Sequence, residues 1–382
     1  MADSFVSFPE SGTVIGAVHN SLNTSIVAIS NDSGSTWSEA YSGGLGPGLS
    51  FLTSFNTRTT LGNAVLVNTT AATVATAAIG TEIAIYNITT TAAHTNTLQR
   101  TVVPTNLQWN FPTSPISEHV CLFSSYSGKV ININITTTLN NNITWLKTVV
   151  IKRNCTAPPK ESGLGWGTLG YADIWLFESN DQRHWKVRSV VATHEQTAAL
   201  GYQEGANEND IVRLRDGTLL VVFRADGGDG YPDHKRKPFL KVISTDNGMT
   251  WTQPVSMGKG VGSARPMLLL LDSGMLLLSG GRPYLNLWAS SSGTGKEWTS
   301  YNLAKEHNMQ ITAHNASTWK FCTAFANSTA TWQGSTCYTS LTKMQDGGAL
   351  ICYDNLGTAS PVAPVSCQTN PVLVFCMQVQ QL

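Results

Sequence analysis

The sequence predicts an all-β protein, specifically a six-bladed β-propeller, from three observations. A hairpin pattern of two apolar runs around a glycine turn occurs six times in 382 residues, and a third apolar run follows each hairpin. Two of these third runs lead into the same eight-residue turn. Repetition of a unit of about four strands is the sequence signature of a propeller. We therefore expect a single propeller domain spanning residues 1–382.

The hairpins are predicted from their turns. The strongest signal is Asp216-Gly217 between runs of Leu, Val and Ile, because Asp-Gly favours a two-residue hairpin turn. The six turns are expected at Gly12, Gly62, Gly128, Gly217, Gly274 and Gly347.

A third strand is predicted after each hairpin. They are expected at Ser25–Ser30, Ile83–Ile88, Ile174–Ser179, Phe239–Ser244, Leu285–Ser290 and Val372–Met377. Their spacing is uneven, which indicates insertions at about 136–170 and 302–336. The apolar stretch Thr144–Ile151 lies in the first insertion and would add a seventh unit if it formed its own sheet. We expect six.

The eight-residue turns read SNDSGSTW at 30–37 and STDNGMTW at 244–251, with degenerate copies ending at Trp185 and Trp298. In each turn the Asp can accept hydrogen bonds from its own backbone, the Gly supplies a positive φ, and the Trp fills the gap to the next sheet. These residues are therefore assigned to the fold and to no chemistry.

Composition excludes several classes of function. The formal net charge is zero, so no nucleic-acid surface is expected. No apolar run approaches the roughly 18 residues of a membrane helix, so no membrane insertion is expected. Nine Asn-x-Ser/Thr sequons predict N-linked glycans and a secreted or cell-surface protein.

The seven cysteines favour disulfides over a metal site. No Cys-x-x-Cys pair and no Cys/His spacing matches zinc, so we expect no metal and no cofactor. Proximity in the chain suggests the pairs Cys322–Cys337 and Cys367–Cys376, although sequence leaves the connectivity open.

The repeat also predicts where a site would lie, because both ends of each innermost hairpin meet at one face of a propeller. The positions nine residues before the turn glycines are Asp3, Thr53, His119, Glu208, Arg265 and Tyr338. The positions seven residues after them are His19, Thr69, Ile135, Arg224, Gly281 (followed by Arg282) and Asp354. Ionisable groups are concentrated in the last three units, although charged residues make up only 13% of the chain.

A tyrosine beside a carboxylate suggests an unusual nucleophile. A phenol ionises near pH ~10, so it needs an adjacent base to attack at neutral pH. A neutral nucleophile suits a sugar whose anomeric carbon carries a carboxylate, because Asp or Glu would be repelled. Arginines bind such a carboxylate through paired hydrogen bonds.

At these residues the chain resembles the sialidase (neuraminidase) superfamily, whose Asp boxes are similar to the two eight-residue turns. NENDIVRLRDGTLLVVFR resembles the acid-then-arginine motif, which implies Glu208 as base and Arg224 as a carboxylate-binding arginine. CYTSLTKMQDGGALICYD is similar to the nucleophile strand, which implies Tyr338 as nucleophile. The third arginine would be Arg282 or Arg265.

The resemblance implies a propeller of sialidase type that cleaves a terminal acidic sugar from a glycan, with retention. Asp354 is a further substrate-binding candidate, with a strand-end salt bridge as the alternative. The enzymatic interpretation requires the Tyr338 phenol to be accessible and directed towards Glu208.

Two departures from the family pattern keep other functions open. No arginine stands near Asp3, where the family's first arginine is expected, and His19 stands where its acid/base aspartate is expected. A histidine can transfer protons, so His19 is a catalytic candidate. The alternatives are a non-catalytic glycan-binding or structural propeller, and a polysaccharide lyase that uses His19 and Tyr338.

Overall fold

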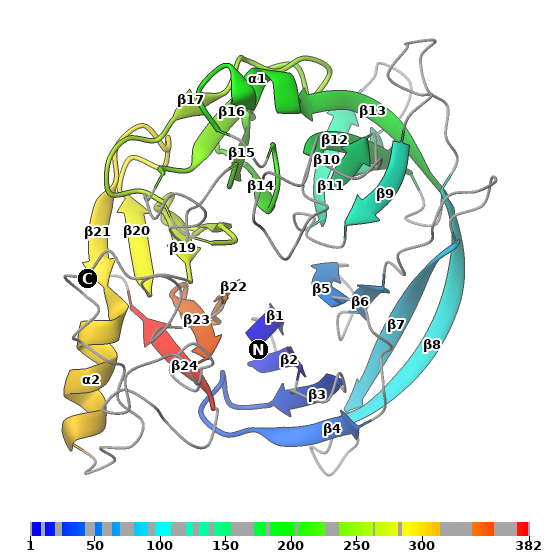
Figure 1. Ribbon diagram of the computed structural model, residues 1–382. Helices are drawn as coiled ribbons and strands as arrows, with labels where there is room; N and C mark the ends of the chain where they lie inside the picture. Colours follow the sequence, from blue (N-terminus) through cyan, green and yellow to red (C-terminus); the bar gives the residue numbers. More distant parts are fainter. Residues whose placement is uncertain are drawn as a thin grey trace, which may run out of the picture. The chain divides into compact units, whose positions relative to one another are not determined.

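The computed structural model (Figure 1) describes residues 2–8, 12–19, 25–42, 50–55, 63–68, 80–90, 96–107, 120–124, 130–136, 141–153, 172–180, 184–202, 205–225, 237–262, 264–281, 285–313, 338–354 and 373–380. The chain divides into two compact units, which are described separately. Unit 1 comprises Met1–Gly46, Gly227–Phe239 and Ser256–Leu382, and unit 2 comprises Pro47–Asp226 and Leu240–Val255. The expectation of one domain stays a prediction.

Unit 1 contains three antiparallel sheets, each with its strands in chain order. The first holds β1 (Ala2–Phe8), β2 (Thr13–His19), β3 (Ser25–Ser30) and β4 (Ser38–Ser42). The second holds β18 (Met267–Leu270), β19 (Leu276–Gly280), β20 (Asn286–Ser290) and β21 (Thr299–Asn302), followed by helix α2 (Leu303–Ala313). The third holds β22 (Thr339–Lys343), β23 (Ala349–Asp354) and β24 (Val374–Val379).

Unit 2 contains a nine-stranded sheet and most of a four-stranded one. The four-stranded sheet holds β14 (Asn209–Arg213), β15 (Leu219–Phe223), β16 (Leu240–Ser244) and β17 (Val255–Ser256). The large sheet holds β5 (Ser50–Phe55), β6 (Asn63–Asn68), β7 (Gly80–Thr90), β8 (Asn96–Leu107), β9 (Val120–Ser124), β10 (Val130–Thr136), β11 (Asn141–Arg153), β12 (Ala172–Ser179) and β13 (His184–Ala192). The short helix α1 (His194–Ala198) follows β13.

Most predicted hairpins are confirmed. β1–β2, β5–β6, β14–β15, β18–β19 and β22–β23 are antiparallel pairs at the expected places. Four of the expected turn glycines are described, and they have positive φ values of 65°, 89°, 95° and 83° at Gly12, Gly217, Gly274 and Gly347. A residue with a Cβ rarely adopts this conformation, which explains why glycine marks each turn.

The predicted hairpin at Gly128 is wrong. β9 and β10 both pair with β11, a strand of 13 residues that is long enough for two partners along one edge. The stretch Thr144–Ile151 lies within β11, so it belongs to this sheet and is neither an insertion nor a seventh unit. Its Leu146 and Val150 are fully buried in the core of unit 2, which gives the physical reason for that pairing.

The second and third predicted units share one sheet. The end of β8 pairs in parallel with the start of β13, at His184↔Asn106 and Trp185↔Leu107. The structure therefore has five sheets among its described residues rather than six separate ones.

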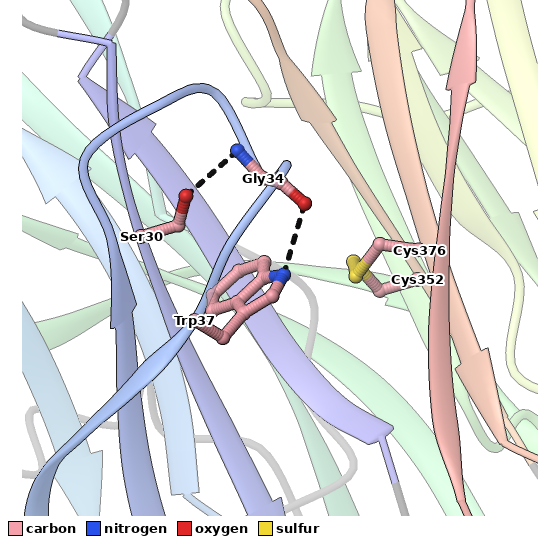
Figure 2. Close-up of a disulfide and its surroundings, with 5 residues drawn as sticks. All are labelled: Ser30, Gly34, Trp37, Cys352 and Cys376. Carbon is pink, nitrogen blue, oxygen red and sulfur yellow. Dashed lines mark hydrogen bonds between the residues drawn. A yellow bond between two sulfur atoms is a disulfide. The ribbon is translucent and has the colours of Figure 1, made fainter.

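The predicted pair Cys367–Cys376 is also wrong, because Cys376 forms a disulfide with Cys352 (Figure 2). The two residues face each other across the β23–β24 register, with Cα atoms 4.1 Å apart. Strand register therefore decides this pairing rather than proximity in the chain. The pair Cys322–Cys337 lies outside the described residues.

The eight-residue turns have the hydrogen bonds predicted for their aspartates. Asp32 accepts from the Thr36 amide at 2.8 Å, and Trp37 Nε1 donates to the Gly34 carbonyl at 3.0 Å, as Figure 2 shows for the tryptophan. Hydrogen bonds to its carboxylate, chiefly from the Thr36 hydroxyl, lower the pKa of Asp32 from 3.8 to about 2. Trp37 packs against the core around the Cys352–Cys376 disulfide, so this turn joins the first and last sheets of the chain.

The second turn has the same aspartate hydrogen bonds but a different partner for its tryptophan. Asp246 accepts from the Met249 and Thr250 amides, both at 3.0 Å, while Trp251 donates to Ser189 of β13 at 3.0 Å. In the degenerate copy at 291–298 an acid at the end of the turn, Glu297, replaces the aspartate and accepts from Ser290 at 3.1 Å. No helix within the described residues is long and apolar enough to cross a membrane.

Candidate functional site

Glu208 and Arg224 meet at one end of the β14–β15 hairpin, as its register predicts. Asn209 pairs with Phe223, so the next pair outward is Glu208 with Arg224, and the Arg224 amide donates to the Glu208 carbonyl at 2.8 Å. The Arg224 guanidinium Nη1 lies 3.3 Å from Glu208 Oε2. Both residues are buried, with 3% of Glu208 and 7% of Arg224 exposed. The predicted meeting of the two residues is confirmed, and the structure shows that they form an ion pair.

The polar residues next to Glu208 in the sequence, which carried no predicted role, are also buried. Asn207, Asn209 and Asp210 are all buried, and Asn209 Nδ2 donates to the Asn207 carbonyl at 3.2 Å. Asp210 accepts from the Ile211 amide at 2.9 Å. A sign of this polar cluster is present in the sequence, because the four successive polar residues 207–210 directly precede the apolar residues of β14. Buried ionisable and amide groups are uncommon unless they are paired or functional.

Arg265 and Tyr338 form the second pair. Arg265 lies just before β18, Tyr338 lies just before β22, and the guanidinium carbon is 5.1 Å from the centre of the phenol ring. Only 2% of Arg265 and 5% of Tyr338 are exposed. A guanidinium over an aromatic face is a favourable cation–π arrangement. The repeat placed both residues at equivalent positions of neighbouring hairpins, and the structure brings their side chains together.

The backbone at Arg265 is strained. Its φ of 44° lies in the left-handed region, and the only other non-glycine residues with positive φ among those described are Ser33 and Asn247 in the eight-residue turns. Pro266 follows, and a residue before proline normally adopts an extended backbone. Strain of this kind costs of order 1–3 kcal/mol and is concentrated at functional sites.

The other predicted site residues are less informative. Asp354 ends β23 fully buried, one position beyond the Thr339↔Tyr353 pair and therefore at the Tyr338 end of the hairpin. His19 is the last residue of β2, but the structure does not describe its side chain. Arg282 lies outside the described residues.

The required relation of Tyr338 to Glu208 stays a prediction, because the two residues belong to different units. The expected accessibility of Tyr338 is wrong, because the residue is buried and only 5% of it is exposed. Among the described residues, no group of three His, Cys, Asp or Glu side chains could hold a metal ion.

Solved structures share this fold. A protein of unknown function from Dyadobacter fermentans matches 100% of this chain and 94% of its own, with a TM-score of 0.56 and 14% identity. The Trypanosoma rangeli sialidase in complex with sialic acid matches 93% of this chain with a TM-score of 0.52 and 13% identity. The same sialidase with 2,3-difluorosialic acid, described as a covalent intermediate, matches 95% of this chain with the same TM-score and identity.

This chain spans about half the length of that sialidase, since the match covers 51% of it. At such low identities the similarity shows the fold alone, a sialidase-like propeller fold. No protein-family model matches the sequence, and no curated protein matches it.

Proposed function

We propose that this protein is a glycoside hydrolase of sialidase type, a six-bladed propeller that removes a terminal acidic sugar from a glycan. The observation that carries the proposal is the Arg265 guanidinium stacked over the Tyr338 ring at 5.1 Å, in a chain with a sialidase-like fold. A phenol beside a fixed cation suits attack on a sugar that carries its own carboxylate, because the cation attracts that carboxylate to the nucleophile.

In this proposal Tyr338 attacks the anomeric carbon as the glycosidic bond breaks, Glu208 accepts the phenol proton, and His19 protonates the leaving oxygen. Water then attacks the same carbon and releases the sugar from Tyr338, which takes its proton back. The Arg224 guanidinium lies 3.3 Å from the Glu208 carboxylate, so a positive charge lies beside the proposed base. Glu208 is assigned as base from its position in the hairpin repeat.

Arg224 and Arg265 are the proposed carboxylate-binding arginines. A guanidinium that lies over an aromatic ring can still bind a carboxylate through its N–H edges. Arg265 is proposed as the third arginine because it contacts Tyr338, while Arg282 lies outside the described residues. His19 is the proposed acid/base residue and Asp354 a substrate-binding residue, both on the sequence pattern. Secretion and N-glycosylation are likewise proposed from the sequons.

The test is hydrolysis of a fluorogenic sialoside by wild type, Tyr338→Phe and Glu208→Gln. Tyr301→Phe is the matched control, because Tyr301 on β21 is 51% exposed. We expect Tyr338→Phe and Glu208→Gln each to lose at least ~100-fold in kcat/KM, and the control to lose less than about twofold. Wild-type turnover that survives Tyr338→Phe would contradict the assignment of the nucleophile.

The low exposure of Tyr338 favours a second candidate, a propeller that binds glycans without cleaving them. That protein would retain binding on a glycan array in Tyr338→Phe and Glu208→Gln, and its wild type would hydrolyse no sialoside. The two assays together therefore separate the candidates.

A further inference from the structure

A pair of buried hydroxyls connects the two hairpins that carry Arg265 and Tyr338. Ser279 Oγ on β19 lies 2.8 Å from Thr339 Oγ1 on β22, which is hydrogen-bonding distance. Ser279 is fully buried, and so is Thr339. The bond therefore crosses from one sheet to the next inside unit 1, where water cannot replace either partner.

The position of this bond relates directly to the stacked pair. Thr339 is the residue after Tyr338, and Ser279 pairs in register with Met267, two residues after Arg265. Next to it, the Gly281 amide donates to the Ala264 carbonyl at 3.2 Å and fixes the backbone just before Arg265. A shift of β22 along β19 would thus move the phenol ring relative to the guanidinium.

The strained backbone makes such a constraint necessary. Arg265 has a φ of 44° and precedes Pro266, so its conformation is one that its local sequence does not favour. A disfavoured conformation persists only where surrounding contacts determine it. The contact with Tyr338 is one of these, and it requires the two hairpins to keep a fixed position relative to each other.

We propose that Ser279 and Thr339 are positioning residues. Their hydroxyl–hydroxyl bond fixes the position of β22 relative to β19 and so places Arg265 over Tyr338. This inference rests on the proposed function for its catalytic consequence, although the geometric part is independent of it. Neither residue touches substrate in this account. Each acts through the placement of the nucleophile and of the arginine that holds the substrate carboxylate.

The test uses the full chain labelled with 3-fluorotyrosine, in which Tyr338→Phe identifies the ¹⁹F resonance of Tyr338. Thr339→Val removes the hydroxyl at constant shape, Thr339→Ser retains it, and Ser279→Ala removes its partner. Thr342→Val is the matched control, because Thr342 is a buried threonine on the same strand.

We expect the Tyr338 resonance to shift or broaden in Thr339→Val and Ser279→Ala, and to be unchanged in Thr339→Ser and Thr342→Val. The kcat for a sialoside should fall about tenfold or more in the first two variants and less than about twofold in the others, because small misplacements of reacting groups are costly. The double variant Ser279→Ala/Thr339→Val should equal either single one, since each already breaks the bond.

An unchanged Tyr338 resonance in both Thr339→Val and Ser279→Ala would overturn the inference. Where the wild type hydrolyses the sialoside, a kcat in Thr339→Val equal to that in Thr342→Val would overturn it as well. Resonance shifts in a protein whose wild type hydrolyses no sialoside would support the positioning role and refute the proposed function. The two failures can therefore be told apart, and Ser279→Ala provides the measurement if Thr339→Val fails to fold.

Discussion

The buried ion pair between Glu208 and Arg224 gives the most quantitative prediction. Its side chains are 4% and 8% exposed, so solvent screens the interaction little. At the observed 3.3 Å and an effective dielectric constant of about 20, the attraction is about 5 kcal/mol. The cost of removing both charges from water offsets much of this attraction, so the pair contributes little net stability. Removing one partner leaves the other charge buried and uncompensated.

We therefore expect Arg224→Met and Glu208→Leu each to lower the free energy of unfolding by about 3–5 kcal/mol. The double variant Glu208→Leu/Arg224→Met should come within about 1 kcal/mol of wild type, because no isolated charge is left. The double variant should nevertheless be inactive. This combination of restored stability and lost activity would show that the pair is retained for function.

The assay is urea unfolding followed by tryptophan fluorescence, evaluated as a double-mutant cycle. Lys186→Met is the matched control, because Lys186 forms an ion pair with Glu178 at 3.0 Å but is 57% exposed, and it should cost less than about 1 kcal/mol. Additive losses in the double variant, or losses below about 1 kcal/mol in the single ones, would refute the reasoning.

Three further predictions concern the turns and the disulfide. The pKa of Asp32 is lowered to about 2, so its hydrogen bonds stabilise the fold above pH ~4 and this contribution is lost as the pH falls towards 2. The difference in urea midpoint between wild type and Asp32→Asn should therefore shrink over that range, and a constant difference would contradict this prediction. Gly248→Ala should destabilise the protein more than Gly347→Ala. Both glycines have a φ of 83°, but only a Cβ at position 248 would lie 2.5 Å from a leucine side chain. Equal shifts in melting temperature would count against this packing. Cys352→Ala should cost about 3.5 kcal/mol, as expected for a disulfide that closes a loop with a sequence separation of 24. Peptide mapping under non-reducing conditions should recover Cys352 joined to Cys376, whereas recovery of Cys367–Cys376 would contradict the strand register.

The sequence predicts features that depend on neighbouring residues. Five of the six glycine turns between apolar runs correctly predict a hairpin, and the strand register of one of these hairpins brings Glu208 to Arg224. The eight-residue turns were likewise predictable, because Asp, Gly and Trp each have one role at a fixed spacing. Their hydrogen bonds in the structure follow that assignment.

Features that depend on distant parts of the chain were not predictable. Whether β9 pairs with β10 or β11 depends on the length of β11 and on what covers its apolar face. Cys352 meets Cys376 through strand register across a long connection. The stacking of Arg265 on Tyr338 depends on a positive φ before a proline, which local sequence preferences disfavour.

Covalent trapping with 2,3-difluorosialic acid tests the central claim most directly, because it asks whether the Tyr338 oxygen can be reached by a sugar and can attack it. The protein would be incubated with the compound, its intact mass measured, and the modified peptide sequenced. The account predicts one fluorosialyl adduct on Tyr338, absent from Tyr338→Phe and strongly reduced in Arg265→Ala. An unmodified wild-type protein, or an adduct on another residue, would contradict it.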